Sequence, residues 1–86
     1  MPEISRFYGI VIAMYYNDHG TPHFHARYGS SKIKIQIDPL TIVAGSLPPR
    51  ALSLVVEWAA MHRQELLDNY ALIMARQVPH RIEPLS

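Results

Sequence analysis

The sequence predicts an α+β domain in which a small antiparallel sheet of three to four strands packs against one long C-terminal helix. Three observations lead to this fold class. Apolar and polar residues alternate in 23–28 and again in 32–37, β-branched and aromatic residues dominate 4–16, and neither Pro nor Gly interrupts 50–76. Alternation with a period of two is typical of half-buried strands, and apolar residues every three or four positions are typical of a helix. We expect a single domain, 1–86, because a chain of 86 residues has room for no more.

The composition narrows the class of protein. Apolar residues make up 49% of the chain and charged residues 17%, which favours a folded protein over a disordered one. The absence of cysteine excludes disulfides, thiolate metal sites and thiol nucleophiles. Such a short chain has a thin core, which excludes dinucleotide-binding folds and two-lobed enzymes. The start of the chain does not resemble a signal peptide, and its apolar stretches are far shorter than the ~20 residues that span a bilayer, so we expect a cytoplasmic protein without membrane contact.

The first predicted strand covers 4–16. Its residues are apolar on both faces, which favours a central strand, and Gly9 is a candidate bulge. The composition of 17–22 then predicts a loop.

The next two strands, 23–28 and 32–37, are predicted to pair as a hairpin. A two-residue turn at Gly29-Ser30 suits the geometry in which Gly takes a positive φ, and it sets Ala26 opposite Ile33. The same register produces one apolar face and one cationic face. The cationic face carries two cross-strand pairs, which are Arg27 with Lys32 and His25 with Lys34.

The cationic face is a candidate anion site. No acidic residue lies between Asp18 and Asp38, and like charges placed opposite each other reduce stability unless something neutralises them. We therefore predict that Arg27, Lys32 and Lys34 bind RNA or another anion, with a plain solvated face as the alternative.

A short fourth strand is predicted over 41–44 and a helix over 49–76. A helix of this length extends about 40 Å, whereas an eight-residue strand extends about 26 Å. The second half of the helix should therefore overhang the sheet, unless the helix breaks near Asn69. The overhang predicts an exposed apolar surface for a second copy or a partner protein, formed by Leu66, Tyr70, Ile73 and Met74.

Four possible metal ligands lie within eight residues: Asp18, His19, His23 and His25. His23 and His25 project from the same face of a strand, so they can converge on one Zn²⁺ or Ni²⁺ ion together with a loop residue. Histidines that brace the turn, or that contact a phosphate group directly, are the alternatives.

A metal-free ribonuclease is a further interpretation of the same segment. His23 and His25 would act as the acid and the base that cleave RNA. Lys34, with Lys32 and Arg27, would stabilise the charged transition state.

Five short motifs are typical of one known family. They are Met-Pro-Glu-Ile-Ser-Arg-Phe at 1–7, Met-Tyr-Tyr-Asn-Asp-His at 14–19, Pro-His-Phe-His-Ala at 22–26, Gly-Ser-Leu-Pro at 45–48 and Glu-Trp-Ala-Ala-Met-His-Arg-Gln-Glu-Leu at 57–66. Over essentially its whole length the chain resembles the small bacterial DUF4160 family. Two departures are Thr21, where the family usually has proline, and Tyr70, where tryptophan is common.

The resemblance implies a context rather than a reaction, because the family carries no established activity. Its members often occur beside a DUF2442-type protein, in an arrangement like a toxin–antitoxin pair. The leading hypothesis is therefore a component of a two-protein system that binds this partner, or a second copy of itself, and RNA, and that needs no cofactor. The ribonuclease and the metal-binding protein are the other two hypotheses.

Overall fold

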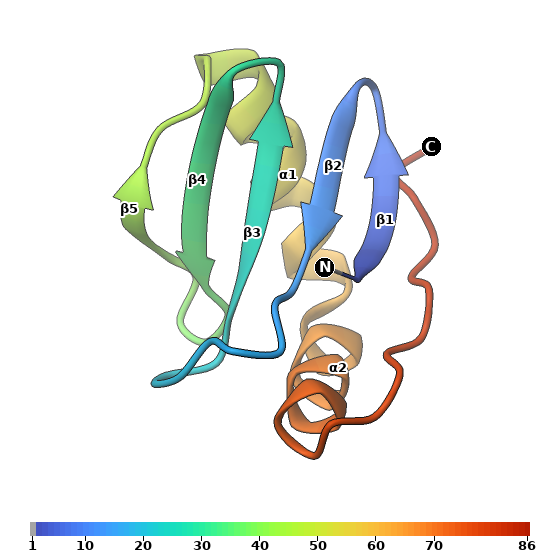
Figure 1. Cartoon of the computed structure of the whole chain (residues 1–86). Coiled ribbons are helices and arrows are strands. Elements are labelled where there is room, and N and C mark those ends of the chain that lie inside the picture. The colour runs from blue at the N-terminus through green and yellow to red at the C-terminus, as the bar shows by residue number, and fades with distance from the viewer. Residues whose placement is uncertain (1) are drawn as a thin grey trace.

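The computed structural model describes residues 2–86 and confirms the α+β class. Five antiparallel strands form one sheet in which each strand pairs with the next along the chain (Figure 1). The strands are β1 Glu3–Phe7, β2 Ile10–Ala13, β3 His23–Tyr28, β4 Ser31–Gln36 and β5 Thr41–Gly45, followed by the helices α1 Pro49–Met61 and α2 Arg63–Met74. Within residues 2–86, neither helix is long and apolar enough to cross a membrane.

The first predicted strand is in fact a hairpin, and this raises the strand count to five. Tyr8 and Gly9 have φ angles of 51° and 78°, and Phe7 pairs with Ile10 across them. Two consecutive positive φ angles are typical of a type I′ turn. An aromatic residue rarely takes this conformation, so the sequence did not reveal the turn. β2 lies between β1 and β3 and is buried throughout, which explains why 4–16 is apolar on both faces.

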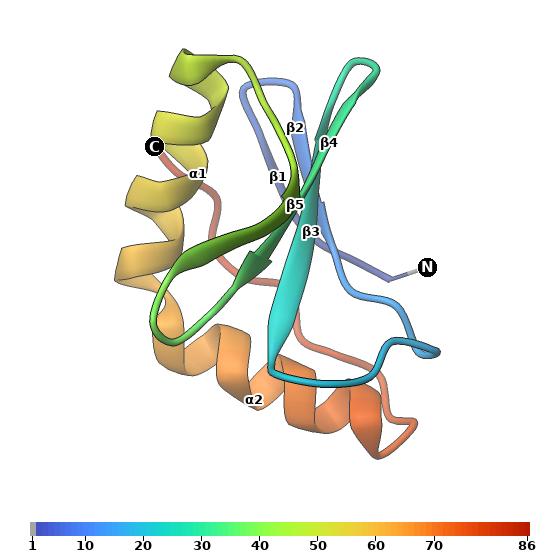
Figure 2. The same ribbon diagram turned by 90° about the vertical axis from the view of Figure 1, so that its left-hand side faces the viewer.

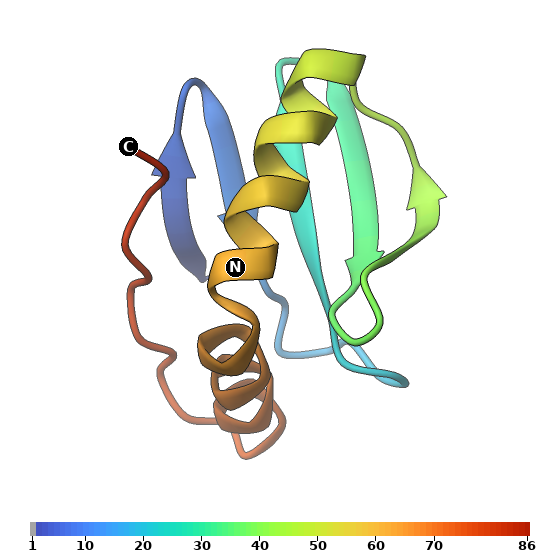
Figure 3. The ribbon, with the colours of Figure 1, turned by 180° about the vertical axis from the view of Figure 1, so that it is seen from behind.

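The hairpin of β3 and β4 has the predicted register. Ala26 pairs with Ile33, and the turn residue Gly29 has a φ of 59°. α1 covers one face of the sheet (Figures 2 and 3). The apolar residues of the hairpin are buried on that face, where Phe24 contacts Trp58 of α1, and the cationic residues lie on the opposite face. The predicted fourth strand is β5, which ends one residue later than expected, at Gly45. A Cβ at Gly45 would lie 2.2 Å from the carbonyl oxygen of Lys32, so only glycine fits there.

The prediction of a single long helix over 49–76 is wrong, because the helix is interrupted at His62. This residue has φ −123° and ψ 26°, and it ends α1 and starts α2. Its ring packs on Trp58, with the ring centroids 5.4 Å apart, and its Nδ1 lies 2.6 Å from Oε1 of Glu65. The break turns α2 across the end of the sheet (Figure 2).

The break removes the apolar overhang that was expected to bind a partner. Leu66, Tyr70 and Ile73 are buried in the chain's own core, and only Met74, at 39% exposure, remains accessible. The apolar residues of α2 pack against the end of the sheet, so they do not form the exposed partner surface that the sequence predicts.

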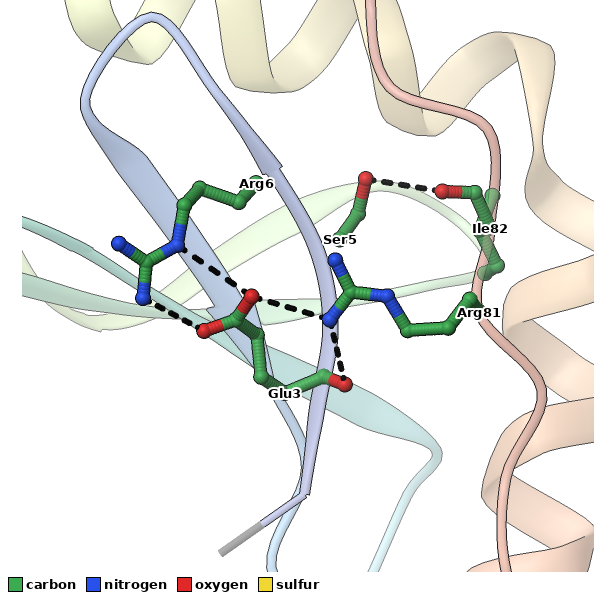
Figure 4. Close-up of polar contacts among 5 residues, drawn as sticks. All are labelled: Glu3, Ser5, Arg6, Arg81 and Ile82. Atoms are coloured by element: carbon green, nitrogen blue, oxygen red, sulfur yellow. Dashed lines mark hydrogen bonds and ion pairs between the residues drawn. The ribbon is translucent and has the colours of Figure 1, made fainter.

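The last residues of the chain cover the free edge of β1 (Figure 4). The backbone N–H of Ile82 donates to the carbonyl of Ile4 at 2.8 Å, and the Ser5 hydroxyl donates to the carbonyl of Ile82 at 3.0 Å. Ile82 is buried in the core. The C-terminal segment therefore protects this sheet edge as an additional strand would.

Asn69 anchors the C-terminal segment from α2. Its side-chain amide donates to the carbonyl of His80, and the N–H of His80 donates back to Oδ1, both at 2.8 Å, while Asn69 is 1% exposed. We expect Asn69→Ala to lower the free energy of unfolding by about 1–3 kcal/mol, because two hydrogen bonds of a buried amide are lost. Urea denaturation measures this loss, with the exposed Gln64→Ala as control. Equal values for the two variants would contradict the anchoring role.

Glu3 links β1 to the C-terminal segment by electrostatics. Its carboxylate accepts hydrogen bonds from Arg6 at 2.7 Å and Arg81 at 2.9 Å (Figure 4). These two hydrogen bonds, with that from Arg6 the stronger cause, lower the pKa of Glu3 from 4.5 to about 2. The folded state therefore gains stability from ionised Glu3 above pH 4.5 and loses it as the pH falls towards 2. Glu3→Gln should make the urea midpoint less sensitive to pH over this interval, whereas Glu57→Gln should not. An unchanged pH dependence in Glu3→Gln would contradict the role of this carboxylate.

Candidate metal centre

The loop between β2 and β3 brings a carboxylate to the start of β3. Asp18 lies in this loop, and His23 and His25 follow on β3, two residues apart and therefore on the same face. The loop is held from below by α2, because the Tyr70 hydroxyl donates to the carbonyl of Gly20 at 3.2 Å. A contact across fifty residues of sequence thus sets the position of Asp18 relative to the strand.

The three side chains form a compact set of ligand atoms, here called the Asp18 cluster (Asp18, His23 and His25). Oδ2 of Asp18 lies 2.7 Å from Nε2 of His25 and 3.1 Å from Nε2 of His23. All three ligand atoms lie within 4.8 Å of one another. Ligand atoms around a tetrahedral Zn²⁺ are about 3.3 Å apart when each lies about 2.0 Å from the ion. The three atoms are therefore close enough together to hold a metal ion, with Oδ2 slightly nearer to both nitrogens than this separation.

The hydrogen bonds of His23 point to a positive charge inside the cluster. Its Nδ1 lies 2.9 Å from the carbonyl oxygen of Thr21, so Nδ1 carries the proton and donates. In the neutral ring Nε2 then has no proton, yet it faces Oδ2 of Asp18 at 3.1 Å. Two acceptors at this distance repel each other unless a proton or a cation lies between them. A metal ion bound to Nε2 satisfies both groups, and a backbone carbonyl on the other ring nitrogen is the usual support of a metal-binding histidine.

Burial differs strongly among the three ligands. The side chain of His23 is 2% exposed, whereas those of His25 and Asp18 are 26% and 28% exposed. One side of the cluster is therefore closed by protein and the other is accessible from solvent. Three protein ligands with an accessible fourth position are typical of catalytic rather than structural zinc sites.

The titration behaviour of the cluster favours its metal-binding form. Burial lowers the pKa of the His25 imidazole below its ordinary value, and this effect outweighs the hydrogen bond to Asp18. Burial acts to raise the pKa of Asp18, but its interactions with the His25 and His23 rings prevail and lower it. Neutral His25 and ionised Asp18 are the protonation states that bind metal.

Two tyrosines orient the histidine rings. The Tyr15 ring meets His25 edge-on at a centroid distance of 4.5 Å, and the Tyr70 ring lies 5.5 Å from His23. Their roles here were not predicted from the sequence. The sequence placed Tyr70 on the expected partner surface and Tyr15 in an apolar strand, so neither was expected beside the histidines.

His19, predicted as a fourth ligand, is not part of the Asp18 cluster. His19 is exposed. Among residues 2–86, the group of ligand atoms that lie close together comes from Asp18, His23 and His25. His19 lines a neighbouring hollow of about 220 Å³ together with His23 and Lys34. The sequence of the loop shows no periodicity, so it did not indicate whether Asp18 or His19 would lie close to His23 and His25.

The predicted anion-binding residues lie beside the cluster on the cationic face. Lys34 pairs with His25 across the hairpin, and Arg27 pairs with Lys32 closer to the turn. Arg27 and Lys32 are exposed and Lys34 is half-buried. The structure thus brings Lys34 next to the Asp18 cluster and leaves Arg27 and Lys32 further along the strands.

Comparison with protein families identifies the chain. The model of the family described as "Domain of unknown function (DUF4160)" matches residues 9–71. The chain belongs to the DUF4160 family. This confirms the resemblance drawn from the short motifs, and the matched part of the DUF4160 chain contains the whole Asp18 cluster and Tyr70. No curated protein and no solved structure matches the chain.

Proposed function

We propose that this DUF4160 protein binds a divalent transition-metal ion, such as Zn²⁺ or Ni²⁺, through Asp18, His23 and His25. The observation that carries the proposal is the pairing of His23 Nε2 with the Asp18 carboxylate, while Nδ1 of the same ring donates to Thr21. The burial of His23 and the bond from its Nδ1 to the Thr21 carbonyl hold this ring in place, which a chance cluster on the surface would not show.

The ligand set indicates what the ion would do. Two imidazoles and one carboxylate leave room for a water molecule or a ligand oxygen on the accessible side, where a bound Zn²⁺ lowers the pKa of water and polarises a carbonyl or phosphoryl group. Lys34 lies across the hairpin from His25 and would favour an anionic ligand there.

The geometry does not favour the metal-free ribonuclease. Both ring nitrogens of His23 are engaged, and its side chain is 2% exposed. A general acid or base must come within hydrogen-bond reach of the substrate, which a buried, fully engaged ring does not do. His25 and Lys34 are accessible enough to contact a substrate, but His25 is only one of the two histidines that the acid–base pair requires.

The two-protein, toxin–antitoxin-like role stays a prediction, as does RNA binding by Arg27, Lys32 and Lys34. Membership of the family supports the first through the usual neighbour of its members, and the charge of the cationic face supports the second. Neither depends on the metal.

A Co²⁺ titration tests the metal site directly. We expect one Co²⁺ per chain with visible absorption bands, which Zn²⁺ displaces. His25→Ala and Asp18→Asn should weaken binding by about 100-fold, whereas His19→Ala, in the same loop but outside the cluster, should leave it unchanged. Binding should also weaken in acid, where protons compete for the imidazole of His25, and the lowered pKa of this ring moves the loss below the ordinary histidine range.

Circular dichroism of each variant shows that the fold is intact, so a loss of binding reports on the ligands. Absence of a Co²⁺ spectrum at neutral pH, or an equal loss in His19→Ala, would refute the proposal.

A further inference from the structure

β5 is a sheet edge that the chain leaves uncovered. It is the last strand of the sheet, and among residues 2–86 no strand pairs with its far side. All five of its residues are exposed, including Ile42 at 50% and Val43 at 53%. The opposite edge, β1, is covered by the C-terminal segment through Ile82. One edge of the sheet is therefore covered by the chain itself, and the other is open to solvent.

β5 is short and has a bulge at Val43, between the pairs Lys34–Ala44 and Ile35–Ile42, but its side chains do not block the edge. Edge strands are commonly blocked by charged residues or proline, and Thr41–Gly45 contains neither. Its outward N–H and C=O groups are available to pair with an added strand, which is a common mode of peptide recognition.

The cationic face specifies acidic side chains. Lys34 pairs with Ala44, and Ile33 pairs with Gly45, so small residues of β5 lie beside Lys34 at this point, while Val43 lies beside it on the side nearer His23. The small residues leave a shallow hollow of about 240 Å³ beside β5. Its lining includes His25, Lys32, Lys34, Ala44 and Gly45. Strands are spaced about 4.8 Å apart, so a glutamate on an added strand extends over Ala44 and meets the lysines from the other side.

We propose that β5 pairs with an extended segment of a partner protein that places acidic residues toward Lys32 and Lys34 and apolar residues toward Ile42. A second copy of the chain is a poorer occupant, because its own β5 carries no acidic residue and would bring a second row of lysines. The proposal does not require a bound metal ion, although the hollow shares His25 and Lys34 with the proposed metal site.

Synthetic peptides of alternating Glu and Val, eight residues long and fluorescently labelled, test the backbone part of the proposal. In a strand, residues with side chains on one face direct their N–H groups to one edge. N-methylation of every Glu, or of every Val, therefore removes N–H donors from one edge only while every side chain is kept. We expect one N-methylated peptide to bind at least about tenfold more weakly than the other, as measured by anisotropy.

Variants of the protein test the electrostatic part. Lys34→Ala should weaken binding of the Glu-Val peptide by about two- to fivefold, and it should not affect a Thr-Val peptide. Arg27→Ala removes the same charge from the cationic face but two strands away from β5, so it is the matched control. Addition of salt should reduce the difference between the Glu-Val and Thr-Val peptides.

Three outcomes would overturn the proposal. The first is no binding of the unmethylated Glu-Val peptide, or equal binding of the two N-methylated forms. The second is a dimer of the free protein that Ile42→Lys converts to a monomer, which would assign β5 to a second copy. The third is binding of an oligouridylate that Lys34→Ala weakens while the Glu-Val peptide does not bind, which would assign the lysines to nucleic acid.

Discussion

Zn²⁺ should raise the melting temperature of this protein by about 10 °C or more. A free ligand concentration of about 100 times Kd stabilises the folded state by about 2.7 kcal/mol, and each kcal/mol shifts the melting temperature of a domain of this size by about 4–8 °C. The stabilisation arises because the three ligands, Asp18, His23 and His25, converge only in the folded chain. Differential scanning fluorimetry or calorimetry, with and without a chelator, measures it.

The variants separate metal binding from the intrinsic stability of the loop. At the same Zn²⁺ concentration, 100-fold weaker binding leaves His25→Ala and Asp18→Asn a shift of only about 2–3 °C, whereas His19→Ala should keep the full shift. His23→Ala is less informative, because the ring is buried beside Tyr70 and its removal destabilises the apo protein as well. A full Zn²⁺ shift that survives in both His25→Ala and Asp18→Asn would place the ion elsewhere.

The second large effect is expected at Trp58, the single tryptophan of the chain. Its side chain is fully buried, lies against Phe7 and Phe24 with centroid distances of 5.3 Å and 6.1 Å, and donates from Nε1 to the carbonyl of Glu83 at 2.8 Å. Trp58→Ala should lower the free energy of unfolding by about 3–5 kcal/mol. Small domains have only about 5–15 kcal/mol in total, so this variant loses a large share of its stability and should melt at least about 12 °C lower than the wild type.

Trp58→Phe keeps the test informative if the alanine variant does not fold. It retains an aromatic ring but loses the hydrogen bond to Glu83 and part of the volume, so we expect a loss of about 1–3 kcal/mol. Urea denaturation followed by circular dichroism gives both values, since the fluorescence of Trp58 is lost in the variants. Met61→Ala, at a site 59% exposed on the same helix, should change stability by less than about 0.5 kcal/mol. A Trp58→Phe protein as stable as the wild type would contradict the role of this side chain.

The exposed apolar surface of the folded chain is not the one that the sequence predicts. The sequence suggested α2, because a continuous helix would have left Leu66 and Ile73 beyond the sheet. In the structure both are fully buried, and the exposed apolar residues of the sheet edge are Ile42 and Val43 on β5 instead. A partner in a two-protein system would therefore meet a strand edge next to lysines, and the peptide experiment tests this arrangement without a known partner.

The candidate site was only partly predictable from the sequence. His23 and His25 lie on a strand of clear alternation, so their shared face and the pairing of His25 with Lys34 followed from local patterns. The third ligand lay in a loop without periodicity, and a choice between Asp18 and His19 was not possible there. The contact of Tyr70 with the carbonyl of Gly20, fifty residues away, decides how that loop is held.

The sequence by itself determined the α+β class, the β3–β4 hairpin and its register, and family membership. These features depend on local rules, since the side-chain period of a strand is two and a Gly-containing turn sets the pairing. The tertiary structure alone decided the turn at Tyr8-Gly9 and the helix break at His62. Neither is marked by a strong local signal, because their free energy comes from burial. The break allows Leu66, Tyr70 and Ile73 to cover the sheet end, and burial of each large apolar side chain contributes about 1.5–3 kcal/mol. This exceeds the cost of a few lost helical hydrogen bonds, so packing between distant residues overrides the local preference for one continuous helix.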